Sequence, residues 1–291
     1  MDIKMIALDM DGTLLNSDSQ ISARNLAILI KLQEQGIRIV LASGRNYHKL
    51  EDYGRLLQMD RFGGYYIEVN GMAIKPAFNN ERRIIERLKL DDAKRIYKVI
   101  KDQSIEFQFL MDMHVYIRIP KSMLQRKIDY RNENNIASDV PWRASTVAPT
   151  LKANSGYPVT IYVQDDDILK EDLNKVCLAG NIEEVEHVNQ LLRKEFKEEF
   201  WIGKTAAMWL EVCPKGNTKG NALESLAKEL NILPEEIMAF GDGENDIEML
   251  SFAKHSYAMA NALPSVKAVS SHITLSNDDD GVYEILKNFI N

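Results

Sequence analysis

The chain has 291 residues, of which 45% are hydrophobic and 27% charged, a composition typical of soluble globular proteins. Its formal net charge of −7 and its lack of basic runs argue against binding to nucleic acid or to anionic membranes. The apolar runs are far shorter than the roughly 18 residues of a membrane span. This length allows one large domain or two smaller ones.

The N-terminal sequence MDIKMIALDMDG lacks the layout of a secretory signal. The two cysteines, Cys177 and Cys213, have no CxxC spacing and no histidine cluster beside them. This arrangement predicts neither a disulfide framework nor a structural zinc site. Both cysteines lie in apolar runs, so we interpret them as buried strand residues. We expect a cytoplasmic protein.

The first part of the chain alternates strands with helices. The segment Ser22–Gln35 has helical periodicity and stops at Gly36, a common residue just beyond a helix end. Another helix should follow Ser43-Gly44-Arg45, and Asn70-Gly71 predicts a hairpin turn. Short links between alternating elements favour a parallel sheet with right-handed crossovers. The strands expected here are Ile3–Leu8, Ile37–Ala42, Tyr65–Val69 and Met72–Lys75.

The same alternation returns at the C-terminal end. The acid run Asp278-Asp279-Asp280 precedes the last helix, where negative charge is favoured, so we assign it no catalytic role. The elements expected here are helices at Thr218–Leu230 and Ile247–Ala253 and strands at Glu236–Phe240, Ser256–Ala260 and His272–Leu275.

The middle of the chain, roughly residues 84 to 208, is richer in hairpin-like strand pairs. We interpret it as a second α/β module set inside the first. Its expected helices are Asp91–Gln103, Lys121–Asn135 and Ile182–Phe196, and its expected strands are Ile105–Met111, His114–Ile119, Val159–Gln164 and Lys175–Ala179.

Two carboxylates, Asp9 and Asp11, stand in the segment DMDGT where the first strand leaves the core. A calcium loop needs glycine at its sixth position and an acid at its twelfth, whereas here Gly12 is fourth and Gln20 is twelfth. A simple Asp-Gly turn would explain Asp11 but not Asp9. Ligands of open parallel sheets bind beyond the carboxyl ends of the strands, so we expect a binding crevice at this point.

Two further segments carry polar groups at such positions. The hydroxyl of Ser43 and the backbone N–H groups expected at the start of the next helix would suit a phosphate, although ordinary helix capping by Ser43 explains this motif more simply when it is taken alone. Lys219 opens a helix, where a cation opposes the macrodipole by about 0.3–1 kcal/mol. A lysine aimed at carboxylates or phosphate accounts for that position better than a surface lysine. The segment around it lacks the residue order of a P-loop.

A fourth segment, GDGEND, follows another buried strand. Asp246 is an ordinary residue for a helix start, but Asp242 has no structural explanation. Two unit charges about 4 Å apart repel by roughly 4 kcal/mol at an effective dielectric near 20. A cluster of these acids with Asp9 and Asp11 therefore calls for a cation, and ligands that are all oxygen favour Mg²⁺.

These four segments, DMDGT, SGR, the lysine of NTKG and GDGEND, resemble in sequence and order the motifs of the haloacid dehalogenase superfamily. The long insert between the second and third motifs, and the tail with AMANA and SNDDDGV, are similar to its Cof-type phosphatases. The resemblance covers essentially the whole chain. It implies an α/β fold, with a Rossmann-like, doubly wound parallel-sheet core at 1–83 and 209–291. An inserted α/β cap at 84–208 would close over the site and contact the leaving group.

The resemblance also implies roles for individual residues. Asp9 would be the nucleophile that forms an aspartyl-phosphate, and Asp11 would be the general acid and base. The Mg²⁺ ligands would be Asp9, the backbone carbonyl of Asp11 and Asp242. Asp246 would orient Lys219 or a metal-bound water, and Thr13 would support the site. The residues expected to hold the phosphoryl oxygens are Ser43, Gly44, Lys219 and Asn245.

The expected function is Mg²⁺-dependent hydrolysis of a small phosphorylated metabolite, such as a sugar phosphate, and the insert carries no substrate signature. A phosphomutase or phosphotransferase could use the same intermediate and pass the phosphoryl group to an alcohol. A receiver-type signalling module also gathers acids, a hydroxyl and a lysine around Mg²⁺, but the large insert argues against it. The sequence indicates no particular oligomeric state.

Overall fold

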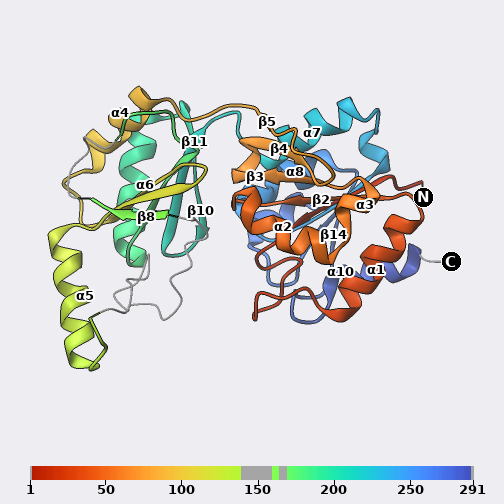
Figure 1. Ribbon diagram of the computed structural model, residues 1–291, viewed down its shortest axis with the longest axis horizontal. Helices are drawn as coiled ribbons and strands as arrows, with labels where there is room; N and C mark the ends of the chain where they lie inside the picture. The colour runs from red at the N-terminus through yellow and green to blue at the C-terminus, as the bar shows by residue number, and fades with distance from the viewer. Residues whose placement is uncertain (1, 139–158, 164–168, 290–291) are drawn as a thin grey trace. The chain divides into compact units, whose positions relative to one another are not determined.

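The computed structural model describes residues 2–138, 159–163 and 169–289. The chain divides into two compact units. One unit, here called the core unit, consists of Met1–Glu86 and Gly216–Asn291, and the other, the inserted unit, is Arg87–Lys215. The colours of Figure 1 show this organisation, because red to orange and blue segments from both ends of the chain build the core unit.

The core unit contains a sheet of strand order β14-β13-β12-β1-β2-β3-β4-β5. The strands from β14 to β3 run parallel, and β4 and β5 extend the sheet as antiparallel strands. Consecutive parallel strands need crossover connections, which here are mostly helical. The strands are β1 (Met5–Asp9), β2 (Arg38–Ala42), β3 (Tyr65–Glu68), β4 (Ala73–Pro76), β5 (Arg83–Ile84), β12 (Ile237–Gly241), β13 (His255–Ala258) and β14 (His272–Ile273).

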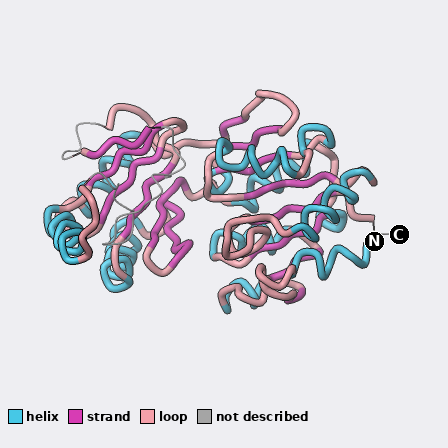
Figure 2. The backbone as a smooth tube through the Cα atoms, turned by 60° about the horizontal axis from the view of Figure 1, so that its bottom comes forward, coloured by secondary structure: helices cyan, strands magenta, loops and turns pink. Residues whose placement is uncertain are grey.

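Helices lie on both faces of the core sheet (Figure 2), so the Rossmann-like, doubly wound fold is confirmed. The sequence sets their starts, because the Ser22 hydroxyl accepts a hydrogen bond from the backbone N–H of Asn25 and caps the first helix. Among the described residues, no helix combines the length and hydropathy needed to span a bilayer. The helices are α1 (Ala23–Glu34), α2 (Tyr47–Leu56), α3 (Met59–Phe62), α7 (Lys219–Glu229), α8 (Ile247–Phe252), α9 (Pro264–Val269) and α10 (Gly281–Leu286).

Strand β1 is central to the core unit, because it pairs with β2 on one side and β12 on the other. All five of its residues are buried, and Leu8 pairs with both Leu41 and Phe240. Such a strand, covered on both faces, reads as a continuous apolar run rather than an alternating one. Its rigid position fixes the direction in which the chain leaves the sheet at Asp9.

The inserted unit has a sheet of order β10-β11-β9-β6-β7-β8, in which every pair is antiparallel except β7 with β8. Phe107 and Phe109 of β6 pack with apolar residues of α4 and α6 to form its core. Its strands are β6 (Glu106–Leu110), β7 (His114–Arg118), β8 (Val159–Tyr162), β9 (Lys175–Ala179), β10 (Phe200–Ala206) and β11 (Trp209–Pro214). Its helices are α4 (Leu90–Ile100), α5 (Lys121–Glu133) and α6 (Ile182–Phe196).

The boundaries of the inserted unit differ from the expected 84 and 208. Residues 209–214, expected in the core, form β11, which pairs with β9 and β10 of the inserted sheet. The two cysteines are buried thiols on β9 and β11, which agrees with their interpretation as strand residues.

Several local details also differ from the expected elements. The hairpin between β3 and β4 is present, but its connection is the 3₁₀ turn η1 (Val69–Gly71) rather than a two-residue turn. The short elements α3, α9 and β5 were not predicted, because two to six residues carry too little periodicity. Gln164, the last residue of one expected strand, lies outside the described residues.

Candidate active site

Strands β12, β1 and β2 are neighbours in the core sheet, and their carboxyl ends carry three of the four motifs. Asp9 is the last residue of β1 and is 6% exposed. Asp242 comes directly after β12, and Ser43, which is also buried, comes directly after β2. Because parallel strands end at the same edge of a sheet, these residues gather there.

The fourth motif adds a buried cation to the same place. Lys219 is the first residue of α7 and is completely buried. Its Nζ atom lies 2.5 Å from Oδ1 of Asp9 and 2.6 Å from Oδ1 of Asp246. A buried ammonium is costly unless it is paired, and two carboxylates here offset both desolvation and the unfavourable position at a helix start.

Asp246 uses its two carboxylate oxygens for different tasks. While Oδ1 pairs with Lys219, Oδ2 accepts hydrogen bonds from the backbone N–H groups of Asp242 and Gly243, at 2.9 and 3.0 Å. Asp246 therefore connects the loop after β12 to the lysine. The hydroxyl of Thr13 donates to Oδ1 of Asp242 at 2.9 Å, which fixes the direction of that carboxylate.

The loop after β1 approaches Asp242 closely. Gly12 has a φ of +82°, a conformation that favours glycine, and a Cβ atom placed there would lie 2.5 Å from Oδ2 of Asp242. The side-chain amide of Asn261 donates to the carbonyl of Gly12 at 2.8 Å and holds the turn. Any larger residue at position 12 would therefore force either the loop or the Asp242 carboxylate to move.

The site has more negative than positive charge. Carboxylate oxygens of Asp9, Asp242 and Asp246 all lie within 4.8 Å of one another, and Lys219 is the cation that pairs with two of them. Burial raises the pKa of Asp9 well above its usual range, and the charge of Asp246 raises it further, while Lys219 acts in the opposite direction. Burial, with a further contribution from Asp246, also raises the pKa of Asp242, to about 6.

This donor set fits a divalent metal ion. The cluster offers several carboxylate oxygens and no sulfur or imidazole, a set that suits Mg²⁺ rather than zinc. Its unneutralised negative charge is reduced when a cation binds. Asp11 is not part of this group, because its side chain points elsewhere.

The side chain of Asp11 is 59% exposed and pairs with Arg45. The Nε of Arg45 donates to Oδ2 of Asp11 at 2.8 Å, and its Nη2 donates to Oδ1. Arg45 follows Ser43 and Gly44 in the loop after β2, and its backbone N–H donates to the Ser43 hydroxyl at 3.2 Å. The structure thus brings the SGR motif next to the first motif, through a contact that the sequence analysis did not predict.

Asn245 lies in the loop after β12, where its Nδ2 donates to Oδ1 of Asn70 at 3.0 Å. The sequence predicts only a turn at Asn70 and no role for Arg45. The signals for both residues were present, because Asn70 follows a buried strand end and Arg45 belongs to the SGR motif. Neither signal indicates which residue Asn70 or Arg45 contacts.

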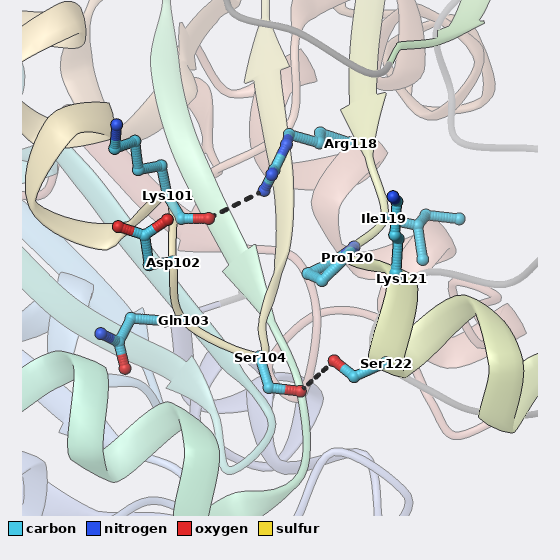
Figure 3. Close-up of a pocket in the computed structure, with 9 residues that line it drawn as sticks. All are labelled: Lys101, Asp102, Gln103, Ser104, Arg118, Ile119, Pro120, Lys121 and Ser122. Carbon is cyan, nitrogen blue, oxygen red and sulfur yellow. Dashed lines mark hydrogen bonds between the residues drawn. The ribbon is translucent and has the colours of Figure 1, made fainter.

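A separate pocket of about 600 Å³ lies in the inserted unit (Figure 3). It lies between the end of α4 and the start of α5, and two hydrogen bonds cross it, from Arg118 to the carbonyl of Lys101 and between Ser104 and Ser122. None of the expected site residues lines it, and its lining contains a single carboxylate, Asp102. It lacks the pair of acids that nucleophilic phosphate chemistry needs.

The fold and the acidic cluster define a hydrolase with a Rossmann-like core into which a second α/β unit is inserted. The chain belongs to the haloacid dehalogenase-like hydrolase family, whose family model matches residues 6–286. This confirms the family predicted from the four motifs, and it excludes the receiver-type signalling module.

Known relatives match over nearly the whole chain. Phosphatase YwpJ of Bacillus subtilis is 28% identical over 99% of this chain and 100% of its own length. The HMP-PP phosphatase of Serratia proteamaculans is 28% identical over 91% of this chain and 87% of its own. A solved haloacid dehalogenase-like hydrolase from Bacteroides thetaiotaomicron is 27% identical, with a TM-score of 0.76 over 99% of this chain and 100% of that one. The protein is therefore an enzyme of a family whose named members include phosphatases.

Proposed function

We propose that the protein is a Mg²⁺-dependent phosphatase that hydrolyses a small phosphorylated metabolite through an aspartyl-phosphate on Asp9. The observation that carries this proposal is the buried Lys219 held between Asp9 and Asp246, with Asp242 beside them. Such a cluster supplies a carboxylate nucleophile together with fixed positive charge. Phosphoryl transfer depends mainly on positioning and electrostatic stabilisation of this kind.

In the first step, an oxygen of Asp9 attacks phosphorus, and the bond from phosphorus to the leaving oxygen breaks. Asp11 donates a proton to that oxygen, so the product leaves as an alcohol. In the second step, Asp11 accepts a proton from a water molecule that attacks the aspartyl-phosphate, which releases inorganic phosphate and regenerates Asp9. In the structure Arg45 binds both carboxylate oxygens of Asp11, so this ion pair has to open before Asp11 can donate or accept a proton.

The carboxylates of Asp9 and Asp242 and the backbone carbonyl of Asp11 would hold Mg²⁺. When bound, the ion neutralises negative charge on the phosphoryl oxygens during transfer. Thr13 supports this arrangement by fixing the direction of the Asp242 carboxylate. Burial, followed by the negative charge of Asp246, raises the pKa values of Asp9 and Asp242, and a cation bound here would favour the ionised forms of both carboxyls.

The phosphoryl oxygens would be held by groups from three loops. Lys219 provides the charge, and Asp246 positions it by a direct ion pair. The hydroxyl of Ser43, the backbone N–H of Gly44 and the amide of Asn245 would donate hydrogen bonds. Each of these groups sits at the end of a strand or the start of a helix, where the sheet holds it rigidly.

We further propose that the inserted unit acts as a cap that selects the leaving group. Its support is that Arg87–Lys215 forms a compact unit containing none of the four motifs, so it carries no group assigned to the chemistry. The names of the related phosphatases support a small phosphate ester as substrate. Substitutions in this unit should reorder a substrate panel while the Mg²⁺ requirement remains.

A panel of phosphate monoesters assayed with Mg²⁺ and with chelator tests the function. Asp9→Asn should reduce turnover of every hydrolysed ester to below about 1% of wild type, because it removes the nucleophile. The matched control is Asp18→Asn, the same chemical change at an exposed aspartate of the core unit, and it should retain activity. Turnover by Asp9→Asn near that of Asp18→Asn, with equal melting temperatures, would contradict the assignment.

A further inference from the structure

The turn η1 after β3 has an unusual backbone. Three consecutive residues adopt positive φ angles: +49° at Val69, +57° at Asn70 and +99° at Gly71. This region is readily available to glycine and accessible to asparagine, but it costs a β-branched residue such as valine about 1–2 kcal/mol. Such strain persists where the surrounding structure over-determines the backbone, and it clusters at functional sites.

The backbone of this turn is joined to the SGR loop. The N–H of Val69 donates to the carbonyl of Arg45 at 3.0 Å, and the N–H of Asn70 donates to the carbonyl of Ser43 at 3.0 Å. These two bonds span both sides of Gly44. The turn therefore fixes the position of the SGR loop, whose hydroxyl and N–H groups are proposed to hold phosphate.

The same turn lies against the start of α7. A Cβ atom on Gly71 would come 2.2 Å from the carbonyl oxygen of Thr218, so only glycine allows this approach. Thr218 is the cap residue of α7, and Lys219 follows it directly. One three-residue turn thus contacts the segments that carry Ser43 and Lys219.

The side chain of Asn70 reaches a third segment. It is 1% exposed, and its Oδ1 accepts a hydrogen bond from Nδ2 of Asn245 at 3.0 Å. An amide group has two N–H donors and one oxygen acceptor, and this contact uses one of the two donors. It therefore determines which way the Asn245 amide is turned and leaves its second N–H for another acceptor.

We infer that Asn70 is a positioning residue that turns the amide of Asn245 toward the phosphoryl group and joins it to the SGR loop. This inference rests on the proposed function, because it concerns the role given there to Asn245. Asn70 itself need not touch substrate. Its backbone holds one phosphate-binding loop while its side chain orients a donor from another.

The test separates the side chain from the strained backbone. Asn70→Gly keeps the positive φ without steric cost. It removes a buried amide, so its melting temperature is measured together with its activity to show that the protein still folds. A small displacement of a positioned group lowers turnover by up to about 100-fold. We therefore expect Asn70→Gly to lower kcat/KM by about 10- to 100-fold on the best substrate of the panel.

A double-mutant cycle with Asn245→Ala distinguishes positioning from a general structural role. If Asn70 acts through Asn245, then Asn70→Gly should lower kcat/KM less than about twofold when Asn245 is already alanine. An equal factor in both backgrounds would overturn the inference, because the effect would then not pass through Asn245. Should Asn70→Gly not fold, Asn70→Ser replaces it in the same cycle, because its side chain is too short to reach Asn245.

Wild type and Asp9→Asn are measured beside the cycle. An active wild type with an inactive Asp9→Asn supports the proposed function, so that independent effects of Asn70→Gly and Asn245→Ala overturn only the inference about Asn70. Absence of turnover in wild type across the whole ester panel would overturn the proposed function and this inference together.

Discussion

The core unit and the inserted unit both bury charged side chains, but they balance these charges differently. Among the described residues of the inserted unit, Lys127 pairs with Glu106 at 3.0 Å and Lys175 pairs with Glu211 at 2.7 Å. In the core unit, one lysine is shared by two acids of a three-acid cluster.

The balanced pairs are further satisfied by neutral donors. Gln108 donates to Glu106, and the indole N–H of Trp209 donates to Glu211. In each of these ion pairs the charges balance, and removing either member would leave the other charge buried and uncompensated. The cluster at Asp9 is not balanced in this way, because its three carboxylates share one lysine. Charge balance, rather than burial, therefore separates a structural ion pair from a binding site.

The largest effect that tests this comparison is the loss of a lysine from a balanced pair. Lys127→Met leaves Glu106 buried without its cation, so the free energy of unfolding should fall by about 3–5 kcal/mol. Tryptophan fluorescence during urea unfolding reports this unit selectively, because all three tryptophans of the chain, at positions 142, 201 and 209, lie within the inserted unit.

Two controls accompany this variant. Lys127→Met combined with Glu106→Gln removes both charges and should be more stable than Lys127→Met alone. Lys215→Met breaks an exposed pair with Glu198 and should not shift the unfolding curve measurably. If Lys127→Met unfolds at the same urea concentration as Lys215→Met, then the buried pair is not what holds this part of the sheet.

A smaller effect should follow from the equivalent change in the core unit. Lys219→Met leaves Asp9 and Asp246 without their cation. Because the pKa of Asp9 is already well above its usual range, this carboxyl takes up a proton readily, and the loss in chelator should be about 2 kcal/mol. Mg²⁺ should recover much of it, because a bound cation replaces the missing positive charge. The melting temperature of Lys127→Met should not respond to Mg²⁺ more than that of wild type. If Mg²⁺ raised the melting temperatures of Lys219→Met and Lys127→Met equally, the core cluster would not differ from the balanced pairs in its need for a cation.

The smallest effect concerns removal of an acid. In chelator and at low salt, Asp242→Asn should melt higher than wild type by the equivalent of about 1–2 kcal/mol, because it relieves repulsion within the cluster. The measurement belongs near pH 8, because the raised pKa of Asp242 lowers stability progressively as the pH rises from its usual pKa of 3.8, and this cost is fully present only above the folded-state pKa of about 6.

With Mg²⁺ present, wild type should instead melt higher than Asp242→Asn. Wild type should gain stability from the ion by mass action, and Asp242→Asn should lose most of that gain together with activity. Asp18→Asn serves as the control for the change in net charge. A Mg²⁺ shift in Asp242→Asn as large as in Asp18→Asn would mean that Asp242 is not a ligand.

The sequence predicted the parts of this molecule that depend on local patterns. The buried run before Asp9 and the periodicity of Ser22–Gln35 identified β1 and α1 to within a few residues. The helix expected at Thr218–Leu230 is α7, which begins one residue later because Thr218 is its cap. Strand ends and helix starts are positions that local rules describe, so the four motifs could be placed on the correct elements.

Contacts between distant segments could not be predicted in this way. The pairing of Asp11 with Arg45 and that of Asn70 with Asn245 depend on the directions of side chains from different loops. The turn at Val69 contradicts the local preference of valine, so no propensity rule would have found it. The inserted unit also extends past position 208, because β11 pairs with strands that only the folded sheet brings beside it.

The strand order of the core unit has a consequence for protein synthesis. One edge of β1 pairs with β2, which the ribosome makes soon afterwards, but its other edge waits for β12, since Met5 pairs with Ile237. At about 5–20 residues per second, those roughly 230 residues take on the order of 10–50 s. All strands of the inserted sheet are made within that interval, so the inserted unit should become protease-resistant on the nascent chain first. If β1 did not depend on its pairing with β12, pulse proteolysis of stalled chains would show the core unit becoming protease-resistant before the inserted unit.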